Sequence, residues 1–410
     1  MTLSTALRPS SGQRSHHDRL LRRLDWHSEA QPSGRPIDAI IVPAARRAQH
    51  LSGPVDLAGR YGATLVVLAS HQCDIQEAAE LVARTPGSGR AVLAHVSSGR
   101  TPMTSTPTWD DFDVRQLATS ADEFRELSGD RTSNLSLKRN LGLLLARYRN
   151  WRKIMFLDDD IIDIAPEHVH RIAQHLDANR FAGLKTVHFP DNSVVCHANR
   201  LIGQPQGIFV SGAALGVNTS EGVDLQVFPD VYNEDWFAFA AEAHTAGVAH
   251  VGNVRQLEYN PFENPLRASF EEFGDLLAEG LYALFNDGYS LNRATESYWT
   301  HFIDARHQFV EDVRTLLAMY ETHERVQAVK SLQESRDRLE NIRPWHCGAF
   351  LDAWQHDRYR FAQASRRISR HRYAYEDAFA ALGVKRWQEV RFGVVRMPTT
   401  ASNSPGGARR

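Results

Sequence analysis

The chain has 410 residues, a formal net charge of -2 and a hydrophobic share of 42%, which is typical of a soluble globular protein with two or three domains, or with one large domain and an extension. It has no global basic excess, so nucleic acid is not the expected partner. No apolar run approaches the roughly 20 residues of a membrane span, which excludes an integral membrane protein of the helical type. Three cysteines, Cys73, Cys196 and Cys347, stand far apart, which indicates neither a structural zinc site nor a disulfide frame and favours a reducing compartment.

The two ends of the chain differ from the rest in composition. Residues 1–36 are rich in Ser, Arg, His and Pro, and they lack the apolar core of a signal peptide. We therefore expect a disordered N-terminal segment at 1–36, a disordered tail at 394–410 and a cytoplasmic protein.

Three apolar strands alternate with two helices in the first part of the chain. The strands are expected at 37–43, 63–69 and 91–96, and the helices at 51–61 and 75–84. This order predicts parallel strands joined by right-handed crossovers. The first strand ends at Pro43, and Arg46 and Arg47 follow it. These arginines could face a phosphate at the strand-to-helix turn, or they could be the solvated start of a helix.

A basic cluster lies on the next expected helix, 135–147, which follows an irregular stretch at 98–130. Lys138, Arg139 and Asn140 lie near the N-terminal half of this helix. They could reach a bound nucleotide, or they could form a solvated helix face.

Three carboxylates come directly after the next strand. The apolar run 154–157 predicts a strand that is buried on both faces, and Asp158, Asp159 and Asp160 follow it. Open α/β sheets bind their ligands at the carboxyl ends of the strands. Adjacent carboxylates repel one another, so they are best tolerated where a cation shares their charge, and hard oxygen ligands suit Mg²⁺ or Mn²⁺ bound to phosphate. The alternative is a helix N-cap with spare acid.

Two further polar features follow along the chain. Residues 208–217 are apolar and small, and a glycine such as Gly212 allows the backbone to approach a ligand closely, although a tight turn between strands explains the glycines equally well. Glu234 and Asp235 begin a helix, where the helix dipole favours acids. Because Trp236 is next to them, the pair also suits a sugar site. The run 249–254 is expected to be an edge strand.

From residue 264 onward the pattern becomes helical, and helices are expected at 270–285, 297–323, 325–343, 349–364 and 370–382. This region could bind an acceptor, close over a donor or form a homodimer interface.

Together, these motifs resemble glycosyltransferases of the GT-A fold, nearest to the family 2-like enzymes that use nucleotide-diphosphate sugars. The resemblance covers about residues 37–254. Its motifs are Lys138-Arg139-Asn140-x-Gly142-Leu143, Leu157-Asp158-x-Asp160, Val210-Ser211-Gly212 and Asn233-Glu234-Asp235.

The resemblance implies the fold class. We expect an α/β domain at 37–262 with a Rossmann-like, mostly parallel sheet and helices on both of its faces, followed by a helical C-terminal region at 263–393.

The resemblance also implies roles for single residues. Asp160 would bind the divalent cation, Asp158 would contact the ribose or the metal, and His250 falls where many GT-A enzymes have a late metal-ligating histidine. Glu234 and Asp235 match an acidic pair of which one member is the catalytic base in inverting enzymes. The residues expected to contact the nucleotide or the donor sugar are Pro43, Arg46, Asp74, Arg139, Asn140, Asp158, Asp159 and Gly212.

The sequence also departs from the family pattern. An Asp-Asp-Gly-Ser-like turn usually follows the second strand and helps to bind the base and ribose, but here only Asp74 could replace it. The Gln-x-x-Arg-Trp acceptor motif of processive members is absent, as are membrane helices, so a polymer-extruding synthase is not expected.

The predicted function is a glycosyltransferase, with a hexose as the expected sugar, that depends on Mn²⁺ or Mg²⁺. It would move the sugar from a UDP- or GDP-linked donor to a hydroxyl of a small-molecule or glycan acceptor. The alternatives are a sugar-1-phosphate nucleotidyltransferase and a non-catalytic GT-A-like scaffold. The nucleotidyltransferase usually has a Gly-rich loop after the first strand, whereas the residues here are Pro43-Ala44-Ala45-Arg46-Arg47.

Overall fold

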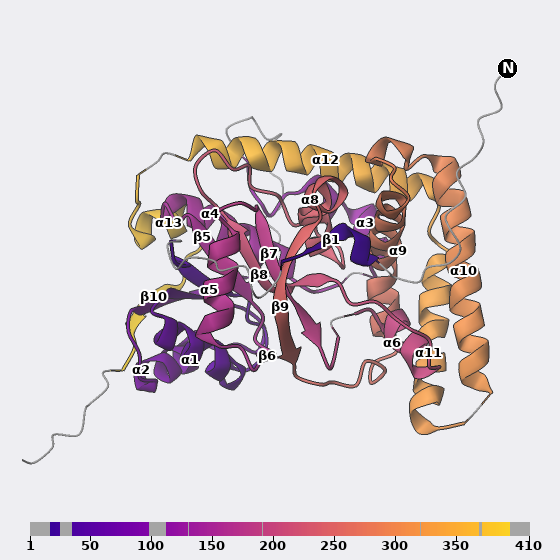
Figure 1. The fold of residues 1–410 in the computed structure, drawn as a ribbon, viewed down its shortest axis with the longest axis horizontal. Coiled ribbons are helices and arrows are strands. Elements are labelled where there is room, and N and C mark those ends of the chain that lie inside the picture. The colour runs from indigo at the N-terminus through magenta and orange to yellow at the C-terminus, as the bar shows by residue number, and fades with distance from the viewer. Residues whose placement is uncertain are drawn as a thin grey trace, which may run out of the picture.

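The computed structural model describes residues 17–24, 35–97, 112–129, 131–190, 192–319, 321–368 and 371–393. These residues form a ten-stranded sheet through the middle of the molecule (Figure 1), in the order β1-β9-β7-β8-β5-β2-β3-β4-β10, with β6 paired to β9. The strands are β1 (Leu21–Arg23), β2 (Ala39–Val42), β3 (Thr64–Ala69), β4 (Arg90–His95), β5 (Lys153–Leu157), β6 (Ile161–Ile162), β7 (Phe181–Val187), β8 (Val210–Asn218), β9 (Val248–Gln256) and β10 (Trp387–Arg391).

Helices connect these strands and then continue beyond them. The α-helices are α1 (Ser52–Tyr61), α2 (Ile75–Arg84), α3 (Asp122–Leu127), α4 (Leu135–Tyr148), α5 (Pro166–His175), α6 (Val194–Leu201), α7 (Glu234–Ala238), α8 (Ala240–Thr245), α9 (Leu266–Asn286), α10 (Glu296–Ala318), α11 (His323–Leu339), α12 (Pro344–Arg367) and α13 (Tyr375–Ala381). The short 3-10 helices are η1 (His17–Leu20), η2 (Ala48–Leu51), η3 (Ala118–Ser120) and η4 (Leu291–Arg293). Among the described residues, no helix combines the length and the apolar character needed to cross a bilayer.

The sheet separates two apolar cores, because successive side chains of a strand point to opposite faces. On β2, Ile40 and Val42 belong to the core that α1, α2 and α5 cover. Ala39 and Ile41 belong to the other core, which α4, α9 and α12 cover. All four residues are fully buried, which explains why this strand reads as a continuous apolar run.

The strand directions confirm the predicted fold class. Pairs among β2, β3, β4 and β5 are parallel, as are those of β7 with β9 and β9 with β1, whereas β8, β10 and the short β6 run antiparallel to their partners. The structure is therefore a mostly parallel sheet with helices on both faces, followed by the helical region that the sequence predicted.

The C-terminal helices pack as a layer beside the sheet, with α10 and α11 side by side and α12 running along one side of the molecule (Figure 1). A buried ion pair joins them to α9: Arg306 of α10 donates to Glu272 at 2.7 Å and to Asp275 at 2.7 Å. Ser335 of α11 donates to the same Glu272. These contacts fix α9, which forms one wall of the site described below.

Both ends of the described chain differ from the prediction. Residues 17–24 were expected to be disordered, but they form η1 and β1, and β1 pairs with β9. For the same reason β9 is not an edge strand, so the prediction for 249–254 is wrong. The C-terminal region is not purely helical, since its last strand, β10, pairs antiparallel with β4. The remainder of the predicted disordered head, apart from residues 35 and 36, and the tail at 394–410 lie outside the described residues.

Candidate active site

The three aspartates lie at the carboxyl end of β5, in a turn that backbone hydrogen bonds hold in place. The N–H of Asp158 donates to the carbonyl of Ala213 on β8 at 2.8 Å, and the N–H of Leu257 donates to the carbonyl of Asp160 at 2.9 Å. Asp159 and Asp160 are buried. The sheet thus presents several carboxylates where parallel α/β sheets bind ligands.

Arg46 shares the charge of two of these carboxylates. Its guanidinium donates to Asp159 at 2.7 Å and to Asp160 at 2.9 Å. Arg46 follows the end of β2, the strand beside β5, so the parallel topology brings the two strand ends together. The other carboxylate oxygen of Asp159, Oδ2, is buried and has no hydrogen-bond partner among the described residues.

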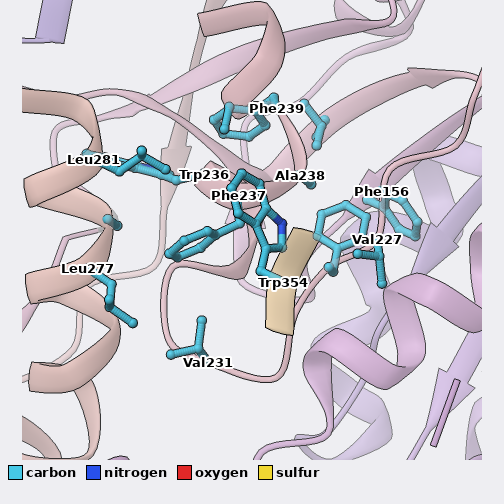
Figure 2. Close-up of a cluster of buried hydrophobic side chains, with 14 of the residues drawn as sticks. Phe156, Val227, Val231, Trp236, Phe237, Ala238, Phe239, Leu277, Leu281 and Trp354 are labelled. Carbon is cyan, nitrogen blue, oxygen red and sulfur yellow. The ribbon is translucent and has the colours of Figure 1, made fainter. Parts of the chain in front are cut away.

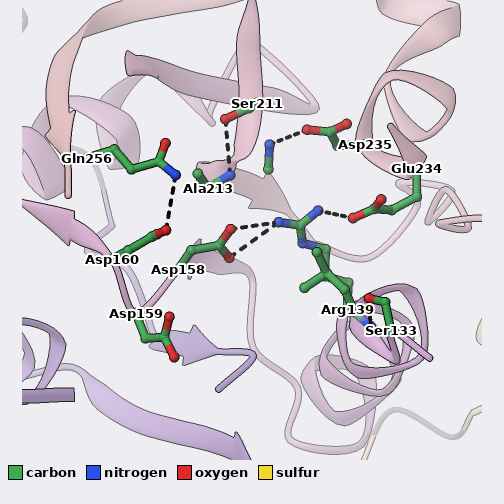
Figure 3. Close-up of polar contacts among 12 residues, drawn as sticks. Ser133, Arg139, Asp158, Asp159, Asp160, Ser211, Ala213, Glu234, Asp235 and Gln256 are labelled. Atoms are coloured by element: carbon green, nitrogen blue, oxygen red, sulfur yellow. Dashed lines mark hydrogen bonds and ion pairs between the residues drawn. The ribbon is translucent and has the colours of Figure 1, made fainter. Parts of the chain in front are cut away.

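Arg139 of α4 connects Asp158, the aspartate that Arg46 does not bind, to Glu234 of the acidic pair (Figure 3). Its guanidinium donates to both carboxylate oxygens of Asp158 at 3.3 Å and to Glu234 at 2.5 Å. It also lies against Gly212, where an added Cβ atom would be 2.4 Å from the guanidinium carbon. Gly212 therefore allows Arg139 to bridge two carboxylates from different elements.

Asp235 contacts the backbone instead of an arginine in the same network. Its carboxylate accepts hydrogen bonds from the N–H of Gly212 at 2.5 Å and from that of Trp236 at 2.8 Å. The short helix α7 is anchored behind the pair by apolar side chains, because Trp236, Phe237 and Phe239 are buried beside α9 and α12 (Figure 2). The apolar core therefore holds the backbone of α7 in place, and the two acids with it.

Gln256, at the end of β9, is a site residue that the sequence interpretation missed. Its Nε2 donates to Asp160 at 3.0 Å, and its Oε1 is buried without a hydrogen-bond partner among the described residues. The only signal in the sequence is that Gln256 follows closely after His250, the residue that was predicted to bind the metal.

The structure does not bring His250, the predicted metal ligand, to the aspartates, and a bulge in β9 explains why. His250 and Gln256 are six residues apart, so a regular strand would place both on one face. The pairing of β7 with β9 shifts between Gly183 and Lys185, which face His250 and Asn253 respectively, so β9 carries one extra residue and the alternation reverses. His250 instead bonds to Asn253 at 3.1 Å, away from the aspartates.

Asn140, a predicted contact of the nucleotide or the donor sugar, binds the protein's own backbone. It is completely buried, and its amide both donates to and accepts from the backbone of Phe228, at 2.8 and 2.9 Å. Its role is to fix the segment that leads to α7.

Asp74, the candidate for base and ribose binding, is the N-cap of α2. It accepts hydrogen bonds from the N–H groups of Gln76 at 2.7 Å and Glu77 at 3.0 Å. It does not line the cavity at this strand end, where His71 and Gln72 do so instead. The ordinary preference for Asp at an N-cap explains its presence.

Lys138 contributes a buried cation next to the aspartates. Its ammonium donates to the carbonyl of Ala44 at 2.6 Å. Burial, which disfavours the charged form, lowers the pKa of Lys138 to about 8. An anion that binds beside this lysine would favour its charged form.

Two cavities meet at the aspartates. The first has a volume of about 660 Å³ and is lined by Pro43, Arg46 and Lys138, among others. The second has a volume of about 570 Å³ and contains Glu234, Asp235 and Trp236. Asp158 and Asp160 line both cavities, so a molecule that filled both would pass over these two carboxylates.

The residues at this junction fit a hard divalent cation. Carboxylate oxygens are the preferred ligands of Mg²⁺ and Mn²⁺, and the buried Oδ2 of Asp159 has no hydrogen-bond partner within the part of the chain that the structure describes. Among the described residues no three His, Cys, Asp or Glu side chains form a group that could hold a metal ion. An ion would therefore be held by Asp158 and Asp160 together with the oxygens of a phosphate ligand, as is usual for Mg²⁺.

Comparison with known proteins gives similarity at the level of structure alone. No protein-family model matches the sequence, and no curated protein matches it. Among solved structures, the chain is similar to glucosyl-3-phosphoglycerate synthase from Mycobacterium tuberculosis in complex with Mn²⁺, UDP and glucosyl-3-phosphoglycerate. The match has 16% identity and a TM-score of 0.36, and it covers 63% of this chain and 87% of that one. It is also similar to a mannosyltransferase from Pyrobaculum calidifontis in complex with GDP-mannose and Mn²⁺, with 15% identity, a TM-score of 0.41 and coverage of 84% and 91%. Identities and TM-scores this low assign no activity to this chain.

Proposed function

We propose that this chain is a metal-dependent glycosyltransferase that moves a sugar, expected to be a hexose, from a UDP- or GDP-linked donor to a hydroxyl of an acceptor. The observation that carries the proposal is the meeting of two cavities at Asp158 and Asp160, with an acidic pair in the second cavity. The nucleoside would occupy the first cavity, the diphosphate would lie at the junction, and the sugar and acceptor would occupy the second cavity.

The first cavity suits a nucleoside diphosphate because of its cations. Arg46, Arg131 and Lys138 line it beside the three aspartates. Arg46 and Lys138 would bind phosphate oxygens, and charge-assisted hydrogen bonds of this kind are roughly twice as strong as those between neutral groups. Phe270 lines the same cavity and offers an apolar face to the base or the ribose.

Asp158 and Asp160 would hold Mn²⁺ or Mg²⁺ at the junction. The ion would supply Lewis-acid stabilisation of the charge that develops on the departing diphosphate. Arg139 would support this role by fixing the orientation of Asp158, since it binds that carboxylate and Glu234 at the same time, and all three residues line the second cavity.

Asp235 is the proposed group for the acceptor hydroxyl. Two backbone N–H groups fix its carboxylate, and it lines the second cavity. In an inverting reaction it would take the proton of the attacking hydroxyl as the oxocarbenium-like transition state forms. In a retaining reaction it would only bind sugar hydroxyls. Glu234 is engaged with Arg139, which makes it a positioning residue in either case.

The test is a thermal-shift experiment on the full chain with UDP or GDP, in the presence of Mn²⁺, Mg²⁺ or EDTA. A ligand that binds only the native state raises its stability by about 2.7 kcal/mol at 100 times its dissociation constant. We expect a rise in melting temperature for one diphosphate, and only with metal. Donor sugar should then be hydrolysed slowly in the absence of acceptor.

Three outcomes would contradict the proposal. No shift with any diphosphate and metal would make Asp158 to Asp160 structural. Binding without hydrolysis or transfer for any donor would indicate a scaffold, and release of pyrophosphate from a nucleoside triphosphate would indicate a nucleotidyltransferase.

A further inference from the structure

The second cavity is acidic in the part that it does not share with the first. Sixteen of its lining residues belong to it alone; two of these are arginines, none is a lysine or histidine, and five carry carboxylates. The five are Glu234, Asp235, Glu271, Asp275 and Glu279.

Both arginines of this wall are already bound to carboxylates. Arg139 binds Glu234 and Asp158. Arg267 binds Glu271 at 2.5 Å, and its guanidinium lies over the ring of Tyr259 at 4.6 Å. Arg46 and Arg131 line the junction with the first cavity, so an anionic group bound to this wall, away from that junction, would have to displace a carboxylate from its arginine.

The three acids of α9 lie on one face of the helix because they are four residues apart. Glu271 accepts from the N–H of Val194 at 2.8 Å, and Asp275 accepts from Ser193 at 2.8 Å, while His17 lies 3.0 Å from Glu279. Burial raises the pKa of both Glu271 and Asp275. Whether ionised or protonated, neither offers a positive charge to a ligand.

One buried atom indicates what the cavity would bind. Gln256 is 6% exposed and lines the cavity, and its Oε1 has no hydrogen-bond partner among the described residues. Leaving a buried acceptor without a donor is unfavourable, and the O–H or N–H group of a ligand would remove that cost. Trp236 lines the same cavity and offers an aromatic face.

Resting on the proposed function, we propose that the acceptor is a polyhydroxylated molecule that carries no carboxylate, phosphate or sulfate group. Its hydroxyl groups, or an ammonium group in their place, donate to Gln256 and to the carboxylates of this wall.

The test uses four matched sugars: glucose, glucosamine, glucuronic acid and glucose 6-phosphate. The full chain is first saturated with Mg²⁺ and the nucleoside diphosphate that stabilises it, and each sugar is then titrated while the melting temperature is followed. We expect glucose and glucosamine to bind at least about tenfold more tightly than the two anionic sugars, since a single like-charge contact at about 4 Å near a protein surface would produce a larger difference than this.

A pair of variants links the preference to this wall. Glu279→Gln removes one negative charge while keeping the shape of the side chain. The ratio of the dissociation constants of glucuronic acid and glucose should then fall about threefold. Glu324→Gln, at an exposed position of the first turn of α11, should leave the gap unchanged.

The inference is overturned if an anionic sugar binds as tightly as glucose, if none of the four sugars binds, or if both variants change the gap equally. The diphosphate titration is completed before any sugar is added. If it gives no shift, the proposed function fails, and the inference that depends on it fails too; if it gives a shift and the sugars fail, the inference alone is wrong.

Discussion

The guanidinium of Arg139 lies directly against the backbone of Gly212, so close that a Cβ atom there would be 2.4 Å from the guanidinium carbon. This contact joins α4, which covers one face of the sheet, to β8, the strand that pairs with β5. It places one positive charge between the carboxylates of Asp158 and Glu234.

Gly212→Ala should therefore impair catalysis more than folding. The new methyl group would push Arg139 out of its bridge, and a displacement of about 1 Å in an active site can cost on the order of 10²-fold in rate. Steady-state kinetics and the melting temperature measure the two effects separately. Gly348→Ala in α12 is the matched control, since its Cβ would meet nothing within 4 Å, and it should gain about 0.5–1 kcal/mol of stability. Normal turnover of the Gly212 variant would show that the bridge is not needed.

Asp160→Asn should abolish metal-dependent turnover. The change removes a negative charge that a divalent cation would need, while the side chain keeps its size. The diphosphate-induced thermal shift with Mn²⁺ should then equal that with EDTA. Asp163→Asn is the control: this exposed residue in the following turn pairs with Arg255, and it has a φ of 57°, which Asn tolerates. Near-normal turnover of the Asp160 variant would remove the core of the proposal.

Asp235→Asn should lower turnover by about 10²- to 10⁴-fold if Asp235 is the general base. The amide oxygen can accept from only one of the two N–H groups that Asp235 now binds, those of Gly212 and Trp236, so the melting temperature should fall somewhat. Donor affinity should change less than turnover. Nuclear magnetic resonance of the product anomer decides between inversion and retention. An inverting enzyme whose Asp235 variant keeps most of its activity would contradict this assignment.

His250→Gln should leave metal-dependent binding unchanged, because His250 bonds to Asn253 away from the aspartates. Gln256→Leu should weaken that binding, since Asp160 would lose a hydrogen-bond donor at a charged group, an interaction of about 1.5–3 kcal/mol. Titration calorimetry of Mn²⁺ in the presence of the diphosphate compares the two variants. If the His250 variant lost Mn²⁺ affinity and the Gln256 variant kept it, His250 rather than Gln256 would face the metal site, and the register of β9 described here would be contradicted.

Diphosphate affinity should fall as the pH rises through about 8. The folded-state pKa of Lys138 is lowered to about 8, so the protonated, phosphate-binding form predominates below that pH and is lost above it. A bound anion would raise this pKa and so delay the loss. Since the unfolded lysine titrates near 10.4, the unfolded state binds more protons between about 8 and 10.4, and the stability of the unliganded protein should rise with pH in that window. Lys138→Met should flatten the pH dependence of both diphosphate affinity and stability. Titration calorimetry of the diphosphate with Mg²⁺ across this range measures the affinity.

The strand-end aspartates were predictable from sequence because an unbroken apolar run leads into them, and such a run reports a strand buried on both faces. The consecutive residues Lys138, Arg139 and Asn140 were harder to assign. A helix turns about 100° per residue, so three neighbours point in three directions. Because α4 is buried nearly all round, nothing in the sequence says which of them faces the site.

Two other features could not be read from the sequence for different physical reasons. The bulge in β9 depends on pairing with β7, and a register shift is a property of two strands and not of one. Strand β1 is three residues long, which is too short for an alternating pattern to stand out from its polar surroundings.

The first and last strands of the described chain, β1 and β10, occupy the two outer edges of the sheet. An open edge strand exposes unpaired N–H and C=O groups that can recruit another chain. During synthesis β1 is made before its partner β9, whereas β10 is made long after its partner β4. The nascent chain therefore carries an unpaired β4 edge from the synthesis of β4 until that of β10, and during that interval the edge can recruit another chain.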